Sequence, residues 1–549
     1  MPANRPFVPL LFLAAALVSY PQEKKLVRLE GRTVNSVTGE VVRKVKLTLS
    51  SGGQEGSPAS ATSDAEGRFV FADLEPGTYT LRAEKIGYIQ QAYGAAQGAF
   101  SVVPITLAGG QEKKDLEFKL VPQAIIAGKV LDEEGEPVGT GASVSVFRAS
   151  RQPGRRPMPM GGSMTNDLGE FRVANLSPGR YLVSANPAAA AHIMLAPGAE
   201  GRPKAAAHSE AVVTTYFPGV TDAGAAEAVE VKAGQELSGV EIPLQKMRVY
   251  RIEGKVVGLA AGQSPRDLRI ITTPRARNGF LMGFSGAGGA VKADGSFAVE
   301  NVAPGNYHLS IMSMGAGMPH VLGSAPVDVS NADVKDLTIP VLPPLQLSGL
   351  VRTDGSRKTD YGNASIMLSS DGGMMFGVFP ARVGADGTFK FESVAPAKYD
   401  VMVMGLDDTV YLKSVRAGKQ EVLEEGLDLI EAQGNVAVEL VLGTRPGTVE
   451  GVVRRDGKPV PGVGVTMLPD SKKAAQRQFM KFANTDQNGH YTLKGAAPGN
   501  YKLYPLMDST SVDLFFDPDA MQSYEDNAVK ITVEEGATAR MDLTVAPAS

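Results

Sequence analysis

A ten-residue frame that recurs five times constrains the fold of this chain more than any other feature. Each copy opens with Gly-x-Phe or Gly-x-Tyr, and a second aromatic residue, always Tyr, follows ten positions after the first. The five aromatic pairs are Phe69/Tyr79, Phe171/Tyr181, Phe297/Tyr307, Phe389/Tyr399 and Tyr491/Tyr501. Internal repetition of this kind indicates a chain built from repeated structural units.

The residues of the frame suit a strand, a tight corner and a second strand. One Asp precedes each opening Gly by one to three residues: Asp64, Asp167, Asp294, Asp386 and Asp486. Asp can accept hydrogen bonds from its own downstream backbone, and Gly adopts a positive φ at no steric cost. The corner itself reads Pro-Gly-x-Tyr in every copy except the fourth, where Ala397 replaces Gly and predicts a less tight corner.

The two aromatic residues have different expected roles. We expect the first to fill a hydrophobic core, which is worth roughly 2–3 kcal/mol per ring. A Tyr just after the corner of a Greek-key sandwich often bonds back to the loop backbone through its hydroxyl. Phe could not form that bond, which would explain why Tyr occupies the second position in all five copies.

Each frame lies within a unit of about a hundred residues, the usual size of a β-sandwich. A strand opens each unit around a Gly, at Gly31, Gly128, Gly254, Gly349 and Gly451. A strand with alternating apolar residues closes each unit, which is typical of an antiparallel sheet with one buried face. The sequence therefore predicts an all-β fold of five tandem Ig-like antiparallel β-sandwiches.

The expected domain boundaries follow from these openings and closings. They are a signal peptide at 1–22, and sandwiches at 26–121, 123–245, 248–343, 345–444 and 446–549, the second with loop insertions at 148–160 and 187–207. The joints between units are short and three of them contain Pro. Short Pro-bearing joints favour a semi-rigid array, and five sandwiches in a straight rod would span roughly 170 Å.

Composition excludes several classes of function. The formal net charge is −4 and no basic stripe is present, so nucleic-acid binding has no electrostatic basis. The chain has no Cys, which excludes thiolate metal sites, thiol redox chemistry and Cys nucleophiles. Residues 7–18 form an apolar run after Arg5, too short to span a bilayer and typical of a secretory signal, and we expect no transmembrane segment after its removal.

The opening Gly strand, the Asp-x-x-Gly-x-Phe turn and the Pro-Gly-x-Tyr corner resemble those of carboxypeptidase regulatory-like domains. That family belongs with transthyretin-like and Cna-B-type sandwiches. The resemblance covers nearly all of residues 26–549 as five copies, with Ala397 and Tyr491 as departures from the pattern. It implies an accessory, non-catalytic module.

The sequence offers few residues for catalysis or metal binding, and we expect no catalytic, cofactor-binding or metal site. The five His residues are His192, His208, His308, His320 and His490, and none has the spacing of a zinc motif. The loop at 283–289 lacks the second Gly of a nucleophile elbow, so we interpret it as a flexible loop.

Two further groups of residues have a structural and a functional interpretation. Asp517, Asp519, Glu525 and Asp526 could hold calcium, although a solvated acidic turn explains them more simply. Lys129 and Lys255 lie on opening strands, where Cna-B-type domains sometimes form a Lys–Asn crosslink, but neither closing strand offers a matching Asn.

Two functions remain from this reasoning. The first is a non-enzymatic secreted protein, periplasmic or at the cell surface, that serves as a spacer or adhesion-like array and contacts an unknown protein or glycan of the cell envelope. The second is carbohydrate binding, with Tyr88, Tyr93 and the pair Tyr216–Phe217 as exposed stacking platforms. The chain has no Trp, the residue that sugar sites use most, which favours the first function.

Overall fold

The computed structural model describes most of the chain as β-strands and turns. The described residues are 26–51, 58–94, 102–139, 141–149, 158–186, 210–259, 264–274, 288–314, 320–341, 345–355, 361–370, 380–432, 434–470, 479–506 and 525–545. The expected signal peptide therefore lies outside the described residues. None of the helices in the described part of the chain has the length and apolar character needed to span a bilayer.

Each opening strand forms the centre of one sheet, between the first strand of the frame and the closing strand. We name the sandwiches S1 to S5 in chain order. The sheets that contain the opening strands are, in strand order, β4 (Arg68–Leu74), β1 (Val27–Asn35) and β8 (Glu112–Leu120) in S1; β12 (Glu170–Leu176), β9 (Ala124–Leu131) and β17 (Glu236–Pro243) in S2; β22 (Ser296–Val302), β19 (Tyr250–Val257) and β25 (Val334–Pro340) in S3; β29 (Thr388–Val394), β26 (Leu345–Thr353), β34 (Asn435–Gly443), β31 (Tyr411–Ala417) and β32 (Gln420–Glu421) in S4; and β39 (His490–Ala496), β35 (Gly447–Arg455), β42 (Thr538–Arg540) and β43 (Leu543–Thr544) in S5, where β36 (Lys458–Pro459) also pairs with β35.

The second strand of the frame lies in the opposite sheet of the same sandwich. These second sheets are β3 (Ala59–Thr62), β2 (Lys46–Ser51), β5 (Gly77–Glu84) and β6 (Gln91–Ala92) in S1, with β7 (Ile105–Leu107) also on β5; β11 (Met158–Met164), β10 (Ser143–Arg148), β13 (Gly179–Asn186) and β15 (Thr215–Tyr216) in S2, with β16 (Val229–Val231) also on β13; β21 (Gly288–Ala290), β20 (Leu268–Pro274), β23 (Gly305–Ser313) and β24 (His320–Val329) in S3; β28 (Ala381–Arg382), β27 (Ser365–Ser370), β30 (Lys398–Met404) and β33 (Leu427–Asp428) in S4; and β38 (Lys481–Asn484), β37 (Gly464–Pro469), β40 (Gly499–Leu506) and β41 (Val529–Val533) in S5. The frame is thus the corner at which the chain crosses from one sheet to the other.

The remaining elements are short. A two-stranded sheet of β14 (Glu210–Val212) and β18 (Lys246–Arg248) joins S2 to the start of S3. Single 3₁₀ turns occur at η3 (Ala223–Ala225), η4 (Pro265–Asp267) and η7 (Glu525–Asn527). The all-β prediction is confirmed.

One strand pairing corrects the antiparallel expectation. In every sandwich the opening strand pairs antiparallel with the first strand of the frame, but parallel with the closing strand. A hairpin forces an antiparallel pair, whereas the opening and closing strands are joined through the whole sandwich and can run in the same direction. Alternating burial, the pattern used for the prediction, does not report strand direction.

Five large clusters of buried hydrophobic side chains fill the sandwiches among the described residues. The first aromatic residue of each frame belongs to its own cluster, as predicted. The interiors are not entirely separate, however, because Phe479, which lies just before β38 of S5, packs into the cluster of S4, with Ala497 against its edge. The joint between S4 and S5 is therefore a packed contact.

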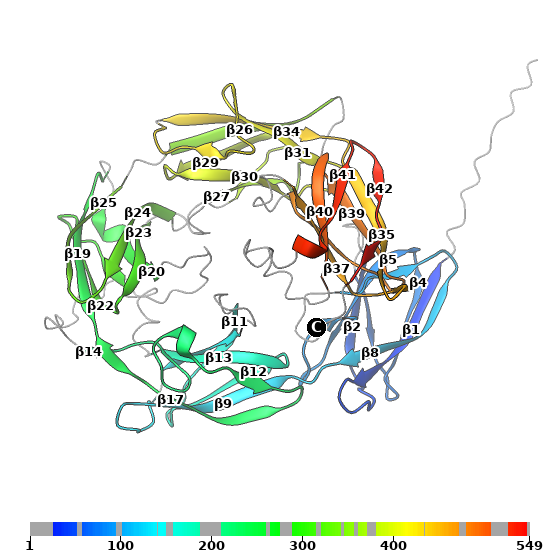
Figure 1. Cartoon of the computed structure of the whole chain (residues 1–549), viewed down its shortest axis with the longest axis horizontal. Coiled ribbons are helices and arrows are strands. Elements are labelled where there is room, and N and C mark those ends of the chain that lie inside the picture. Colours follow the sequence, from blue (N-terminus) through cyan, green and yellow to red (C-terminus); the bar gives the residue numbers. More distant parts are fainter. Residues whose placement is uncertain are drawn as a thin grey trace, which may run out of the picture.

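The sandwiches follow one another around a ring rather than along a line (Figure 1). S5 returns to S1, where the Gln487 side chain makes two hydrogen bonds with the backbone of Thr106. The straight rod expected from the short joints is therefore wrong, because each joint turns the chain in the same sense. In S2 to S5 the sheets of β9, β19, β26 and β35 lie on the outside of the ring, and the second sheets face its centre (Figure 1).

Candidate interaction surfaces

The Tyr of every frame bonds back to the corner that precedes it. The hydroxyl donates to the carbonyl four residues earlier, over 2.5 Å from Tyr79 to Glu75, 2.5 Å from Tyr181 to Ser177, 2.9 Å from Tyr307 to Ala303, 2.8 Å from Tyr399 to Ala395 and 2.6 Å from Tyr501 to Ala497. The predicted role of Tyr is confirmed in all five copies. The corner with Ala397 keeps this bond at an ordinary length, so Gly is not required for it.

Burial of these corner side chains also affects their ionisation. Removal from water raises the pKa of each of the five hydroxyls, to about 12 for Tyr399 and Tyr501. The phenols are consequently protonated donors throughout the neutral range. Each hydroxyl donates its proton to a hydrogen bond within its own sandwich.

The first aromatic residue explains the opening Gly. A Cβ placed on Gly349 would lie 2.3 Å from the Phe389 ring and 2.4 Å from the Val438 carbonyl oxygen of the parallel closing strand. The same crowding by a closing-strand carbonyl occurs at Gly31, Gly128, Gly254 and Gly451. Only Gly lets the ring and the parallel strand approach the opening strand together, a reason that the sequence pattern alone did not supply.

The turn before each first aromatic is held in two ways. In the first, the residue that begins the turn accepts from two downstream backbone N–H groups through its side chain; the acceptors are Asp64, Asn166 and Asp486. In the second, Asp294 and Asp386 accept from the N–H and the hydroxyl two residues later. The expectation that Asp167 accepts these bonds is therefore corrected, because the neighbouring Asn166 accepts them instead.

Among the described residues, those considered for metal or crosslink chemistry do not converge. His192, His208, Asp517 and Asp519 lie outside the described residues, as do 283–287 of the loop at 283–289, whereas Gly288 and Gly289 are in β21. His308 is in β23, His320 begins β24, and the exposed His490 begins β39. Among the described residues no group of three or more His, Asp or Glu is arranged to hold a metal ion.

The two Lys residues and the acidic turn have local surroundings. The Lys129 ammonium lies 3.7 Å from the Glu170 carboxylate across the sheet of S2. Lys255 lies on β19, where it pairs in register with Ser296 and Thr338 rather than with Asn. Glu525 and Asp526 form part of η7, and the Glu525 carboxylate accepts from the Lys502 ammonium over 3.0 Å.

The proposed aromatic platforms are not exposed rings. Tyr93 packs against Phe118 with ring centroids 6.0 Å apart, and burial raises the pKa of its hydroxyl. Tyr88 packs against the core of S1, and Phe217 packs against that of S2. Burial also raises the pKa of the Tyr216 hydroxyl. All four side chains are partly buried, which corrects the expectation that they stand free for stacking.

A shallow hollow of about 980 Å³ lies on the sheet of β26 and β34, in S4. Its floor is made by small and apolar residues, including Ser348, Ala437 and Leu350, of which Leu350 is 41% exposed. It is an open depression on the face of β26 and β34. Two strands added beyond β34, β31 and β32, make this sheet wider than the three-stranded sheets of S1 to S3.

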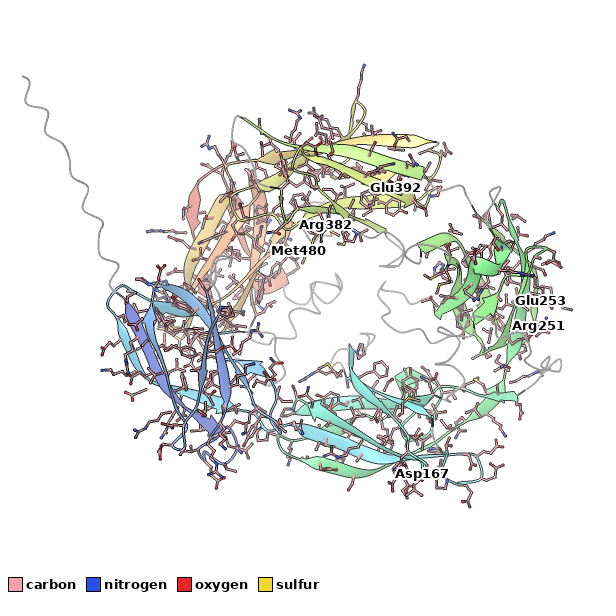
Figure 2. The ribbon with its side chains drawn as sticks, turned by 180° about the vertical axis from the view of Figure 1, so that it is seen from behind. Asp167, Arg251, Glu253, Arg382, Glu392 and Met480 are labelled. Atoms are coloured by element: carbon pink, nitrogen blue, oxygen red, sulfur yellow. The ribbon has the colours of Figure 1, made fainter. Side chains whose placement is uncertain are left out.

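Basic side chains surround this hollow, which we name the S4 hollow. Arg382, Lys390 and Arg416 line it, with Glu439 as the acidic member. The Lys390 ammonium lies 2.8 Å from the Glu392 carboxylate, and the Arg416 guanidinium 3.7 Å from that of Glu421. Figure 2 shows Arg382 and Glu392 on S4. The three basic side chains come from separate strands, β28, β29 and β31, so sequence reasoning did not find them as a group.

A second polar group lies on the ring-facing side of S5. Lys502 lies between the Asp470 and Glu525 carboxylates, at 3.4 and 3.0 Å, and the Tyr504 hydroxyl donates to Glu525 over 3.0 Å. These contacts border a small cluster of Leu468, Tyr504 and Leu506, against which Met480 packs (Figure 2). All of the charges are paired within the group, so it resembles a structural brace rather than a ligand site.

The outer surface of S3 carries charges that are likewise paired within the chain. The Arg251 guanidinium lies 2.9 Å from the Glu253 carboxylate and 3.0 Å from that of Glu300. Arg251 and Glu253 lie on the outside of the ring (Figure 2). Arg251 is therefore paired both within its own strand, β19, and with the neighbouring strand β22.

Comparison with known proteins gives one family and several distant structures. Residues 28–121 match the family model of the carboxypeptidase regulatory-like domain. No curated protein matches the chain. Among solved structures, the chain is similar to the Bacillus anthracis TIE protein (13% identity, 58% of this chain and 51% of that chain, TM-score 0.16), the minor pilin GBS52 of Streptococcus agalactiae (12%, 40% and 96%, 0.21) and two B repeat units of the collagen-binding protein of Staphylococcus aureus (11%, 75% and 99%, 0.13). The match spans about half the length of the first of these.

Proposed function

From a tandem array of carboxypeptidase regulatory-like sandwiches, we propose that this chain is a non-catalytic, secreted protein that serves as a structural and adhesion-like array at the cell envelope. The proposal takes five units, with the boundaries expected from the sequence near 121–123, 245–248, 343–345 and 444–446. One observation carries the proposal. In all five copies the corner Tyr hydroxyl is bonded within its own sandwich, which supports a structural role for the repeated frame.

The S4 hollow supports an interaction role for the array. Its three basic side chains border a floor of small residues that is open to solvent, an arrangement that suits an acidic surface of a protein partner rather than a small substrate held in a closed cavity. The glycan alternative receives less support, because among the described residues that line the hollow the one aromatic ring is that of Phe389, which is buried.

Localisation tests the first part of the proposal. The full chain would be expressed with a C-terminal tag in a bacterial host and recovered from cytoplasmic, envelope and culture fractions. We expect a mature chain that lacks about the first 20 residues, as a secretory signal of 15–30 residues predicts, in the envelope or the culture medium. An unprocessed chain confined to the cytoplasm would contradict secretion.

Binding tests the second part. The purified full chain would be offered to panels of envelope and extracellular matrix proteins and to a glycan array. We expect protein binders that weaken at high salt and with the triple variant Arg382→Ala, Lys390→Ala and Arg416→Ala, but not with the control Arg32→Ala and Arg172→Ala, which removes exposed charges from S1 and S2. Hits confined to glycans would favour the alternative.

A further inference from the structure

S5 meets S1 at the free edge of a sheet. Within the described part of the chain, strand β7 pairs with β5 and has no strand on its other side. On its other side, the Gln487 side-chain oxygen accepts from the Thr106 N–H over 3.0 Å, and the Gln487 side-chain nitrogen donates to the Thr106 carbonyl over 2.8 Å. One amide side chain thus satisfies both backbone groups of an edge residue, as a neighbouring strand would do.

Close packing accompanies this pair of bonds. Val103 is only 6% exposed, although it does not belong to the hydrophobic cluster of S1. Its side chain lies beside Gly94 of S1 and Gly462 of S5, where an added Cβ would come within 2.1 and 3.1 Å of it, respectively. Gly462 has a φ of 75°, so the backbone of S5 can turn directly over Val103.

The position of Gln487 distinguishes S5 from the other sandwiches. Gln487 is the second residue of the turn that begins each frame, and the N–H of the Gly two residues later closes that turn in every copy. The equivalent residues are Ala65, Asp167, Ala293 and Ala385. Ala offers no polar group and an ionised Asp only accepts, so only the last copy carries a side chain that can both donate to and accept from a strand edge.

We propose that Gln487 is a latch that closes the chain into a ring by capping the edge of β7. The contact joins residues 381 positions apart and leaves the turn geometry of the frame unchanged. Closing also covers the one side of β7 on which another strand could add. The closed ring is thus the form of a single chain in solution, and its opening frees a strand edge.

Crosslinking tests the contact directly, because the chain has no Cys of its own. Thr78 and Asn488 are exposed neighbours of Thr106 and Gln487, and the Thr78 hydroxyl lies 3.3 Å from that of Thr106. The variant Thr78→Cys/Asn488→Cys, treated with a flexible bis-maleimide, should give an internally linked monomer. Linkage only between chains, or none at all, would overturn the proposal.

Small-angle X-ray scattering tests the shape. Five domains, each with a radius of gyration near 13 Å, give about 32 Å when set in a ring and about 50 Å when set in a straight row. We expect the full chain near the lower value. A value near the upper one for the unaltered chain would overturn the proposal.

Two variants separate the latch from a general loss of folding. Gln487→Glu keeps the acceptor for the Thr106 N–H but sets a carboxylate oxygen against the Thr106 carbonyl, and Gln487→Ala/Val103→Asp removes both parts of the contact. Both should raise the radius of gyration and reduce internal crosslinking, most strongly in the double variant. The matched control Asn488→Ala, in the same turn, should leave the radius of gyration unchanged. Variants that keep the circular dichroism of the parent and yet stay at the parent radius would contradict the assignment of Gln487.

Discussion

S4 and S5 place different aromatic side chains at the same position, against the opening Gly and beside the closing strand. In S4, Phe389 packs against Gly349 beneath a continuous closing strand, β34. In S5, Tyr491 takes that position, and its hydroxyl donates to the Met541 carbonyl over 2.6 Å. Met541 lies in the gap between β42 and β43, where the closing strand is interrupted.

The difference shows that one hydroxyl repairs a local break in a strand ladder. A buried backbone carbonyl without a partner costs free energy, so the interruption is tolerated where a phenol can reach it. Burial raises the pKa of the Tyr491 hydroxyl, which keeps it a donor. Tyr491, which stands where the other four frames have Phe, therefore compensates for the interrupted closing strand of S5.

Removing either ring should have the largest effect. Phe389→Ala and Tyr491→Ala each open a cavity in a buried cluster, and we expect a loss of about 3–5 kcal/mol in the stability of the sandwich concerned. Hydrogen exchange of the backbone amides in β26 and β35 would measure each sandwich separately. Leu350→Ala, at an exposed site of S4, is the control and should change little. Equal losses in both sandwiches from one variant would mean that S4 and S5 unfold together.

Removing only the hydroxyl should have the next largest effect, and only in S5. Tyr491→Phe keeps the ring but leaves the Met541 carbonyl without its donor, which should cost about 1–3 kcal/mol. Tyr93→Phe is a suitable control, because no hydrogen bond from that hydroxyl occurs within the described residues. Amide exchange in β42 would report the loss. Unchanged protection there would show that the hydroxyl does not compensate for the interrupted strand.

The corner hydroxyls should matter equally in the two sandwiches. Tyr399→Phe and Tyr501→Phe each remove one bond to the corner backbone and should cost about 1 kcal/mol. A larger loss in S5 than in S4 in denaturant unfolding would indicate that Gly499 shapes the corner in a way that Ala397 does not.

The same two hydroxyls predict a pH dependence. The pKa in the folded state is about 12 and lies above the ordinary value of 10.0, so the folded chain holds the proton more tightly than the unfolded one. This contribution to stability is fully present below pH 10 and is lost as the pH rises toward 12. Unfolding midpoints measured between pH 9 and 12 should fall less steeply in the double variant Tyr399→Phe/Tyr501→Phe. An identical slope would contradict the link.

The surface ion pairs should have the smallest effect. Arg352 pairs with Glu439 in S4, and Arg540 pairs with Glu450 in S5. All four side chains are more than a third exposed to solvent. Glu439→Gln or Glu450→Gln should therefore change the free energy of unfolding by less than about 0.5 kcal/mol. Differential scanning calorimetry would check this, and a clear drop in Tm for either variant would show that the pair braces its sheet.

Local chemistry was predictable from the sequence because it depends on residues within one frame. The corner bond from Tyr501 to Ala497 spans four residues, and the buried position of Phe389 follows from its place in a short apolar strand. The opening Gly was visible as a pattern, but its reason required the carbonyl of a strand almost a hundred residues away, as for Gly349 and Val438.

The features that could not be predicted join distant parts of the chain. Parallel pairing of the opening and closing strands leaves no trace in alternating burial. The ring depends on the angle at each joint, and its contact between Thr106 and Gln487 rests on one amide in a turn that otherwise reads like its four counterparts. The S4 hollow gathers basic side chains from separate strands, and its charge pattern appears only after folding.

The parallel pairing of the first and last strands has a mechanical consequence. A pull on the two ends of one sandwich drags these neighbouring strands past each other along their own axes. The hydrogen bonds between the two strands are then loaded in shear. They must break together, and not one after another. Every module in the chain is consequently built to resist stretching from its ends.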